Sequence, residues 1–219
     1  MEPVLDLSPG AVDAAASAAA VRADLPDRLP HDDPDDLVVL LDDDHRPIGT
    51  APRHGVHGTD TPLHLAFSCY LVDGKGRVLL TRRALGKRSW PGVWTNSFCG
   101  HPRPGEDLVD AVSRHGRGEL GLEPEAIRPV LPDFAYRAVD ASGVVENEVC
   151  PVFVARTSDD VEPHPDEVEE HRWVDVSDLR ETVRVAPWAL SPWLVEQAAA
   201  MEEADAWHVL APDETETRP

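Results

Sequence analysis

The alternation of apolar and polar positions divides the chain into short strands and a few helices. LVVLLDDDHRPIGT, residues 37–50, predicts an apolar strand followed by a polar turn. Residues 63–84 contain two apolar runs joined by Asp-Gly-Lys-Gly, and residues 134–157 contain two more joined by Asp-Ala-Ser-Gly, so each stretch predicts a hairpin. Apolar positions at helical spacing over residues 106–121 predict a helix that Gly121 can end.

The C-terminal part of the chain completes the fold prediction. EVEEHRWVDVSDL predicts a strand that leads into a helix, and SPWLVEQAAAMEEADAW predicts a final helix. Strands and helices mix without regular βαβ alternation, which favours an α+β fold, a mixed α/β/α sandwich. We expect one folded domain at residues 35–200, a disordered acidic and alanine-rich tail at 1–34, and a helix end with an acidic tail at 201–219.

Charge is distributed unevenly along the chain, whose formal net charge is −21. Nearly all of the acidic surplus lies in residues 1–36, 157–185 and 196–219, whereas residues 72–103 hold seven bases and one acid. So acidic a chain should repel nucleic acid and anionic membranes. The basic segment is either a solvated hairpin or a site for a compact anion, and its isolation in an acidic chain favours the site.

The cysteines and the apolar runs indicate in which cellular compartment the protein works. Cys69, Cys99 and Cys150 are an odd number at unequal spacing, which argues against a disulfide framework and suits a reducing cytosol. No apolar run approaches the ~20 residues needed to cross a membrane. The alanine-rich start lacks the basic-then-apolar order of a secretory signal. We therefore expect a cytoplasmic protein without a membrane partner, acting as a monomer.

The predicted helix carries a candidate phosphate-handling motif. Four residues fit the frame of the Nudix box, a loop–helix–loop whose glutamates bind Mg²⁺ on a diphosphate: Gly100, Glu106, Arg114 and Glu119. His115 and Gly118 stand where the hydrolase pattern has glutamates. Because hydrolysis needs several carboxylates to hold metal ions and activate water, the remaining Glu119 predicts that hydrolysis is disabled. Chance spacing on an acidic helix is the alternative.

Histidines and a pair of glutamates form a second candidate site. Glu146 and Glu148 lie two residues apart in a predicted strand, so both side chains point to one face. Two such carboxylates between apolar neighbours repel each other unless they are protonated, paired or bound to a cation. With His57, His64 and His101 they could hold Zn²⁺, Mn²⁺ or Mg²⁺, although a single histidine is more often a surface or hydrogen-bonded residue.

Longer stretches resemble a known enzyme family. HGTDTPLHLAFS, TRRALGKRSWPGVWTNSFCGHP, DFAYRA, SGVVENEVCPVF and PWALSPW are similar to type I isopentenyl diphosphate isomerases, and the resemblance covers about residues 37–200. It implies a Nudix fold with a catalytic domain at 35–200. It also implies interconversion of isopentenyl and dimethylallyl diphosphate, by protonation and deprotonation through a tertiary carbocation, in isoprenoid biosynthesis.

The resemblance further implies catalytic and metal-binding roles. It matches Cys99 and Glu148 to the acid/base pair, Tyr136 to a tyrosine that assists the glutamate, and Trp193 to an aromatic ring that faces the carbocation. The matched ligands of one Mn²⁺, Zn²⁺ or Mg²⁺ are His57, His64, His101, Glu146 and Glu148.

The diphosphate end of the site is implied in the same way. Glu119 matches the carboxylate that binds Mg²⁺ with the diphosphate, and Arg83 and Lys87 match phosphate contacts. Arg53 stands where the family often has lysine, and His115 stands where it often has arginine, which leaves the role of His115 open.

The residues suit the chemistry of moving a double bond. A tertiary carbocation must be kept from water, with one group adding a proton and another removing one at the neighbouring carbon. Cys99 is a small, poorly hydrated proton carrier whose reference pKa is near 8.5. Cys69 and Cys150 lie in apolar strands and are expected to be packing residues. Two other hypotheses remain: a Nudix diphosphohydrolase, and a non-catalytic metal-dependent binder of diphosphates.

Overall fold

The computed structural model describes residues 36–211, so the tail expected at 1–34 and the last residues of the acidic C-terminus lie outside the described part of the chain. The described residues form two sheets. The smaller has the order β2-β1-β3-β10-β9. Its strands are β1 (Leu37–Leu41), β2 (Pro47–Pro52), β3 (His64–Leu65), β9 (Ala135–Val139) and β10 (Val145–Val149).

The larger sheet has the order β12-β5-β4-β11-β8, with two short strands added to it. Its main strands are β4 (Phe67–Asp73), β5 (Arg77–Arg83), β8 (Glu125–Leu131), β11 (Val152–Thr157) and β12 (Val168–Asp175). The short strands are β6 (Trp94–Thr95), which pairs with β5, and β7 (Phe98–Gly100), which pairs with β4.

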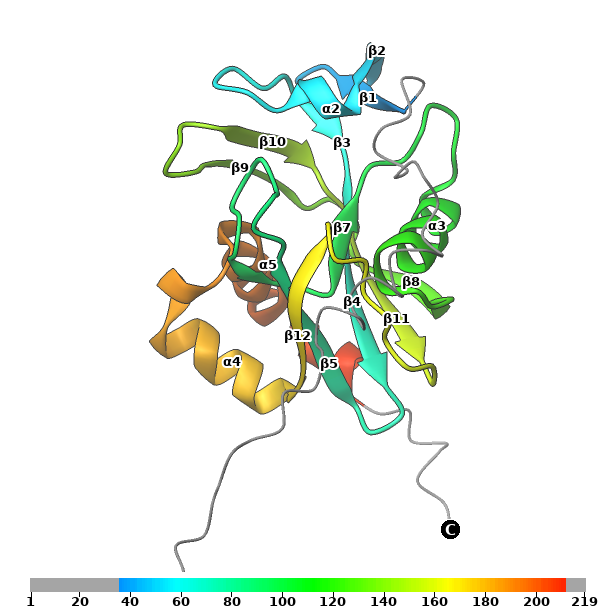
Figure 1. The fold of residues 1–219 in the computed structure, drawn as a ribbon, viewed down its shortest axis with the longest axis vertical. Helices are drawn as coiled ribbons and strands as arrows, with labels where there is room; N and C mark the ends of the chain where they lie inside the picture. The colour runs from blue at the N-terminus through cyan, green and yellow to red at the C-terminus, as the bar shows by residue number, and fades with distance from the viewer. Residues whose placement is uncertain (1–35, 212–219) are drawn as a thin grey trace, which may run out of the picture.

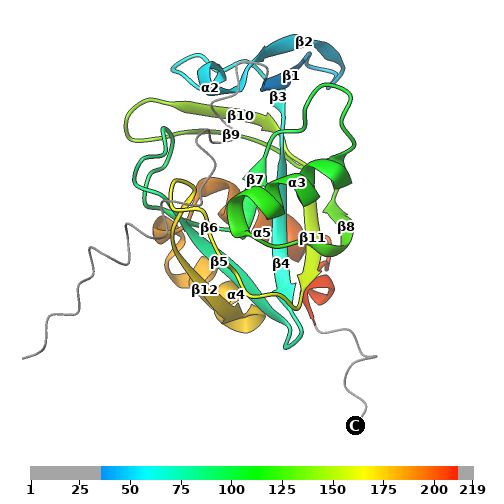
Figure 2. The same ribbon diagram turned by 45° about the vertical axis from the view of Figure 1, so that its right-hand side comes forward.

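Helices cover both faces of the larger sheet (Figures 1 and 2). They are α3 (Leu108–Leu120) on one face and α4 (Val176–Val185) and α5 (Pro192–Glu203) on the other, whereas α2 (Arg53–Val56) lies beside β1 and β2 of the smaller sheet. One core cluster joins the sheet to α3 through Val112 and Leu120, and another joins it to α4 and α5 through Leu179 and Leu194. This confirms the α+β prediction, an α/β/α sandwich. In the described part of the chain no helix is long and apolar enough to span a bilayer.

The two sheets share a pair of long, parallel chain segments. β3 continues into β4 and β10 continues into β11, and the pairs β3–β10 and β4–β11 are both parallel. Backbone hydrogen bonds also join the two segments where one pair of strands ends and the next begins. Ala66 N donates to Val149 O at 2.9 Å, and Ser68 N donates to Pro151 O at 3.0 Å. Because Pro151 has no N–H, the segment changes sheets there. The junction brings strands of both sheets to one place, where the site lies.

The predicted hairpin at 63–84 is confirmed, but its strands diverge. β4 and β5 pair at Val72 and Val78 next to the turn, where Asp73 Oδ1 accepts hydrogen bonds from the N–H groups of Lys75 and Arg77. Farther from the turn, β6 and β7 lie along the inner edges of β5 and β4. The predicted loop and short strand are therefore built into the middle of the larger sheet, and β7 carries Cys99 there.

Helix α3 ends where its sequence predicts, at Gly121, and begins at Leu108, two residues later than the predicted stretch. The side chain of Asp107 accepts from Val109 N at the start, and Gly121 ends the helix in the left-handed region at φ 69°. A Cβ at Gly121 would lie 2.8 Å from Glu162 O, so the position suits glycine for space as well as for conformation.

The core continues beyond the expected domain boundary at residue 200. That boundary falls inside α5, and Met201, Ala206 and Leu210 are buried in the cluster that packs α4 and α5 on the larger sheet. A short 3₁₀ helix, η3 (Trp207–Leu210), carries the last of these side chains. The folded unit thus includes the chain up to about residue 211.

Candidate active site

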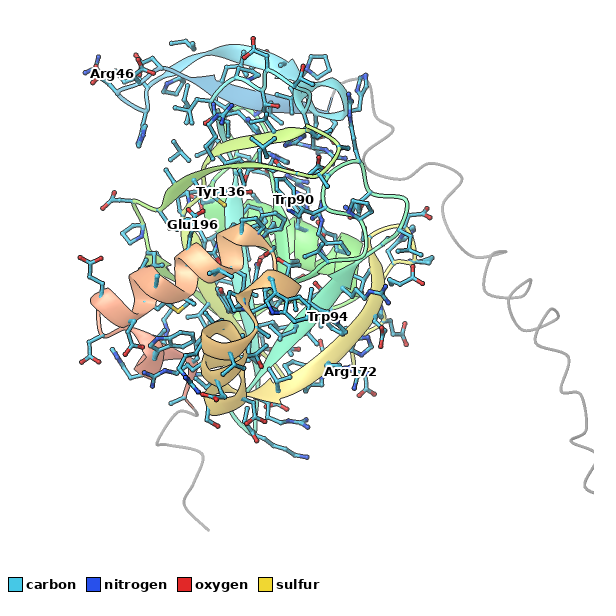
Figure 3. All side chains as sticks on the ribbon, turned by 90° about the vertical axis from the view of Figure 1, so that its left-hand side faces the viewer. Arg46, Trp90, Trp94, Tyr136, Arg172 and Glu196 are labelled. Atoms are coloured by element: carbon cyan, nitrogen blue, oxygen red, sulfur yellow. The ribbon has the colours of Figure 1, made fainter. Side chains whose placement is uncertain are left out.

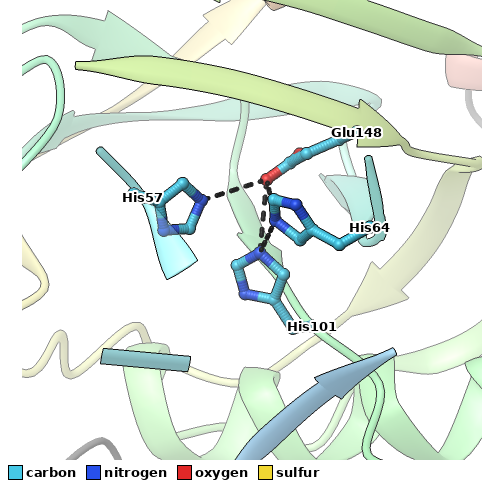
Figure 4. A group of neighbouring side chains, drawn as sticks. All are labelled: His57, His64, His101 and Glu148. Carbon is cyan, nitrogen blue, oxygen red and sulfur yellow. Dashed lines mark hydrogen bonds and ion pairs between the residues drawn. The ribbon is translucent and has the colours of Figure 1, made fainter. Parts of the chain in front are cut away.

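Four side chains converge at the junction of the two sheets (Figure 4). The ligating atoms of His57, His64, His101 and Glu148, here called the ligand cluster, all lie within 4.8 Å of one another. Glu148 Oε1 is 3.2 Å from His101 Nε2, 3.5 Å from His64 Nε2 and 3.7 Å from His57 Nε2. Three imidazoles and one carboxylate thus face a single point.

Strand register sets this convergence. Glu148 on β10 lies opposite His64 on β3 and opposite Tyr136 on β9, and residues directly opposite each other share a face of the sheet. His101 follows β7, which pairs with β4, and His57 follows α2. The ligand cluster is therefore assembled from segments that are distant in sequence.

Glu146 lies beside the ligand cluster. It points to the same face of β10 as Glu148, as its spacing predicts, and its Oε2 is 2.7 Å from His57 Nε2. Its Oε1 accepts a hydrogen bond from Ser89 Oγ. The structure thus brings four of the five expected ligands to one point and joins the fifth to them through His57.

The chemistry of these donors fits a divalent metal ion. His64 Nδ1 is 2.9 Å from Pro62 O, a contact that places the proton on Nδ1 and leaves Nε2 free to donate a lone pair. His57 Nε2 and Glu146 Oε2 are buried and lie 2.7 Å from each other, so both face the ligand cluster away from solvent. Burial lowers the pKa of His101 to about 3, which keeps its ring neutral. Imidazole and carboxylate ligands of this kind suit Zn²⁺, Mn²⁺ or Mg²⁺.

Electrostatics at the ligand cluster favour a positive charge. Burial opposes ionisation of His57, yet Glu146 and Glu148 raise its pKa to about 9. Burial would also raise the pKa of Glu148, but hydrogen bonds with the three histidines hold that pKa well below its usual value. The carboxylate of Glu148 is therefore ionised and fixed in place.

Cys99 and Glu148 line the same cavity, whose volume is about 570 Å³. Tyr136 and Trp193 also line it; Tyr136 Oη donates to Glu148 Oε2 at 3.0 Å, and the two aromatic rings lie 5.7 Å apart. Cys99 packs against this aromatic cluster with Trp90, which Figure 3 shows near Tyr136. Burial raises the pKa of the Cys99 thiol to about 12, so it carries its proton at neutral pH. A thiol and a carboxylate thus share an aromatic-walled cavity.

Basic side chains form a second group in the wall of the cavity, here called the basic end. They come from α2 (Arg53), from the end of β5 (Arg83) and from the loop that follows it (Lys87). Each has an internal partner: Arg53 pairs with Asp36, Lys87 pairs with Glu167, and Arg83 donates to Ser89 O.

Helix α3 adds a carboxylate to this basic end. Glu119 lines the cavity, and its Oε1 is 2.6 Å from His115 Nδ1, one turn earlier. Burial alone would raise the pKa of Glu119, but His115 and the nearby Lys87 and Arg53 lower it, so the carboxylate is ionised. The His115 ring fits closely over Gly100, where a Cβ would lie 2.5 Å from ring atoms.

Known proteins are similar to this chain in sequence over most of its length. Residues 62–194 match the model of the NUDIX domain. The chain is 63% identical over 172 residues to an isopentenyl-diphosphate Delta-isomerase of Frankia alni, covering 78% of this chain and 89% of that protein. It is 57% identical over 180 residues to one of Mycolicibacterium vanbaalenii, covering 82% and 99%. The chain belongs to the isopentenyl-diphosphate Delta-isomerase family.

Solved structures show the same fold at greater distance. The structure of DR0079 from Deinococcus radiodurans has a TM-score of 0.58 at 18% identity, covering 75% of this isomerase-family chain and 98% of that chain. A MutT protein from Methanosarcina mazei Go1 has a TM-score of 0.52 at 19% identity, covering 66% and 96%. These likenesses support the Nudix fold.

The isomerase-family chain also has site residues that its sequence pattern did not single out. Asp36 and Glu167 hold the basic side chains, and Ser89 holds both Glu146 and Arg83. Asn96 and Ser68 contact the Cys99 sulfur. Ser68, Ser89 and Asn96 lie in the stretches that carry the resemblance, whereas Asp36 and Glu167 lie outside them and have no local signal. Arg82, which is next to Arg83 in β5, pairs with Glu170 and is not among the residues that line the cavity.

Proposed function

We propose that the chain interconverts isopentenyl diphosphate and dimethylallyl diphosphate. Its relatives, over most of its length, are named isopentenyl-diphosphate Delta-isomerases. The observation that carries the proposal is the shared cavity, in which Cys99 and Glu148 lie beside a basic end that fits a diphosphate. We also propose that the chain works as a monomer in the cytoplasm, where its three free cysteines stay reduced.

Cys99 and Glu148 are the proposed proton carriers. A proton added to the terminal alkene carbon of isopentenyl diphosphate gives a tertiary carbocation at the neighbouring carbon. Loss of a proton from the next carbon along the chain gives dimethylallyl diphosphate. Because the reaction is reversible, Cys99 and Glu148 each serve as donor in one direction and acceptor in the other. Tyr136, hydrogen-bonded to Glu148 Oε2, fixes the carboxylate and can pass a proton to it.

The aromatic wall protects the cation. Trp193 is buried and its ring lies beside Tyr136, so the negative face of the indole can stabilise positive charge on the five-carbon chain. A cation–π contact of this kind contributes roughly 0.5–2 kcal/mol, which is too little to account for an enzymatic rate. Exclusion of water by the surrounding wall therefore contributes more than this contact.

The residues that would hold metal ions are His57, His64, His101, Glu146 and Glu148, for one Mn²⁺, Zn²⁺ or Mg²⁺, and Glu119, for a Mg²⁺ that arrives with the diphosphate. An ion in the ligand cluster would fix the Glu148 carboxylate and tune its acidity. Arg53, Arg83 and Lys87 are the proposed contacts of the diphosphate oxygens, and they hold the hydrocarbon in register with the proton carriers.

Hydrolysis of the diphosphate is disfavoured by helix α3. Glu106 is engaged by Arg114 through two contacts of 2.7–2.8 Å, and Gly118 has no side chain to offer toward the cavity. Among the described residues of α3 that line the cavity, Glu119 is the carboxylate. One carboxylate can hold a Mg²⁺ on a diphosphate but is poorly equipped to activate water as well.

The direct test is incubation of the purified protein with isopentenyl diphosphate and Mg²⁺ in D₂O, followed by NMR. We expect dimethylallyl diphosphate with deuterium at the carbon that gains the proton. Release of phosphate would identify a hydrolase, and the absence of both a new product and deuterium uptake would identify a binding protein. The Cys99→Ala protein is the matched control for background exchange.

A further inference from the structure

We infer that two buried amides, those of Asn96 and Gln197, set the direction of the Cys99 thiol; the inference rests on the isomerase function proposed above. Both side chains are fully buried, and neither lines the cavity. They cannot touch a substrate there, so they are positioning residues that act through groups that do.

The Asn96 amide has one orientation. Its Nδ2 donates to Cys69 O at 3.0 Å and to Phe98 O at 2.9 Å, which uses both of its hydrogens. Both acceptors are backbone carbonyls of the sheet, from β4 and β7. These two hydrogen bonds fix the amide plane, so Asn96 Oδ1 points in one direction and acts as a hydrogen-bond acceptor.

This one oxygen holds two parts of the proposed catalytic apparatus. Cys99 Sγ donates to Asn96 Oδ1 at 3.3 Å, and Trp193 Nε1 donates to the same atom at 3.0 Å. Thr95 Oγ1 donates to it as well, at 2.9 Å. Asn96 thus ties the thiol that carries the proton to the ring that faces the cation.

A second chain of hydrogen bonds reaches the sulfur from Ser68, which lies directly opposite Cys99 in the β4–β7 pair. Tyr70 Oη donates to Gln197 Oε1 at 2.9 Å, and Gln197 Nε2 donates to Ser68 Oγ at 2.8 Å. Because Ser68 Oγ accepts from Gln197, its own hydrogen is free to point to a sulfur atom, and Cys99 Sγ at 3.2 Å is nearer than Cys150 Sγ at 3.5 Å. The amide of Gln197 therefore sets the direction of the serine hydroxyl.

The sulfur lies between a fixed acceptor and a fixed donor. A cysteine side chain has three staggered rotamers, and two directed hydrogen bonds select one of them. Asn96 Oδ1 accepts from the S–H group when the proton is present, and the Ser68 hydroxyl stabilises the sulfur after the proton has left. The same rotamer therefore serves for donation and for return of the proton.

Activity measurements test this positioning role. A positioned proton carrier contributes on the order of 10²–10⁴ in rate, so Asn96→Ala and Ser68→Ala should each lower kcat by about 10- to 100-fold. KM and the metal content should stay close to those of the unmodified protein, because neither residue lines the cavity. Thr95→Val removes another donor to Asn96 Oδ1 but leaves the amide fixed by its two backbone acceptors, so it is the matched control and should change kcat by less than about 3-fold. Normal kcat in both alanine variants would overturn the inference, as would an equal loss in Thr95→Val.

Infrared spectroscopy gives a readout that does not depend on activity. The S–H stretching band of Cys99 can be assigned by its loss in Cys99→Ser, and it should move to higher wavenumber in Asn96→Ala because the thiol loses its acceptor. If Asn96→Ala does not fold, Ser68→Ala should still shift the band. A band that stays in place in the folded variants contradicts the inference. If the band shifts but the unmodified protein has no isomerase activity, the positioning of Cys99 is supported and the proposed isomerase function is rejected.

Discussion

The two ends of the cavity carry opposite charge and are built in different ways. At one end, the ligand cluster and Glu146 are fixed by strand register and by direct contacts among histidines and carboxylates. At the other, Arg53, Arg83 and Lys87 come from a short helix, a strand end and a loop. Strand pairing places His64 and Glu148 at the first end, with His57 added from the end of α2, whereas the second end is set by side-chain pairing on more local segments.

This difference suggests a division of labour. Rigid placement matters most where a proton moves, because a small displacement removes the overlap between donor and carbon. A diphosphate carries several equivalent oxygens, so the basic end tolerates small changes in the position of each charge. Substitutions at the ligand cluster and Cys99 should therefore lower kcat, and substitutions at the basic end should raise KM.

The largest effect is expected at the two proton carriers. Cys99→Ala and Glu148→Gln should each lower kcat by about 10³-fold or more, because each removes a group that gains or loses a proton. Steady-state kinetics and a circular dichroism melting curve would separate loss of chemistry from loss of fold. Cys69→Ala is the control, since the Cys69 side chain is buried in the core cluster under α3 and its contact with Asn96 is through the backbone carbonyl, which the substitution keeps. Near-normal turnover in either site variant would reject the acid/base assignment.

Removal of a histidine from the ligand cluster should come next. His64→Ala should lose bound metal and lower kcat by at least about 100-fold, because its Nε2 faces Glu148 Oε1 and its Nδ1 is already committed to Pro62 O. Elemental analysis of the purified protein measures the metal. His171→Ala, on the exposed side of β12, is the matched control. Stoichiometric metal in His64→Ala would contradict the assignment.

A smaller effect, on binding, is expected at the basic end. Lys87→Ala should raise KM for isopentenyl diphosphate by about 10-fold and change kcat by only a few-fold, because a charge contact to phosphate is lost. Arg82→Ala is a close control: Arg82 also pairs with a glutamate of the same region, Glu170, but lies outside the cavity. A fall in kcat at constant KM would show that the two ends are not separable in this way.

The smallest effect is expected from the internal partner of Lys87. Glu167 lies in the cavity wall and pairs with Lys87, so it neutralises part of the charge that a diphosphate would meet. Glu167→Gln should lower KM by about 2- to 5-fold, with the effect reduced at high salt. Glu170→Gln, the partner of Arg82, should leave KM unchanged. A higher KM in Glu167→Gln would mean that the carboxylate serves to hold Lys87 in place.

Local sequence signals predicted much of the fold. Asp-Gly-Lys-Gly marked the β4–β5 turn, Gly121 marked the end of α3, and the spacing of Glu146 and Glu148 placed both carboxylates on one face of β10. Each of these features depends on residues a few positions apart. Other features depend on the register between distant strands and had no local signal. Ser68 on β4 lies directly opposite Cys99 on β7, and β6 and β7 are inserted between the diverging strands β4 and β5.

The candidate site shows the same limit. The identities of the ligand histidines came from the resemblance, because spacing alone does not distinguish a ligand from a hydrogen-bonded histidine. The pairs Arg53–Asp36 and Lys87–Glu167 join segments that no periodic pattern connects. The packing of Met201, Ala206 and Leu210 against the larger sheet likewise had no local signal in the sequence.

A crystal structure of the Cys99→Ala protein with isopentenyl diphosphate and Mg²⁺ would test the central claim most directly. We predict that the five-carbon chain lies between position 99 and the Glu148 carboxylate, beside Trp193, with the diphosphate against Lys87 and Glu119. A hydrocarbon chain bound away from Glu148, or a diphosphate bound in the ligand cluster, would contradict this account.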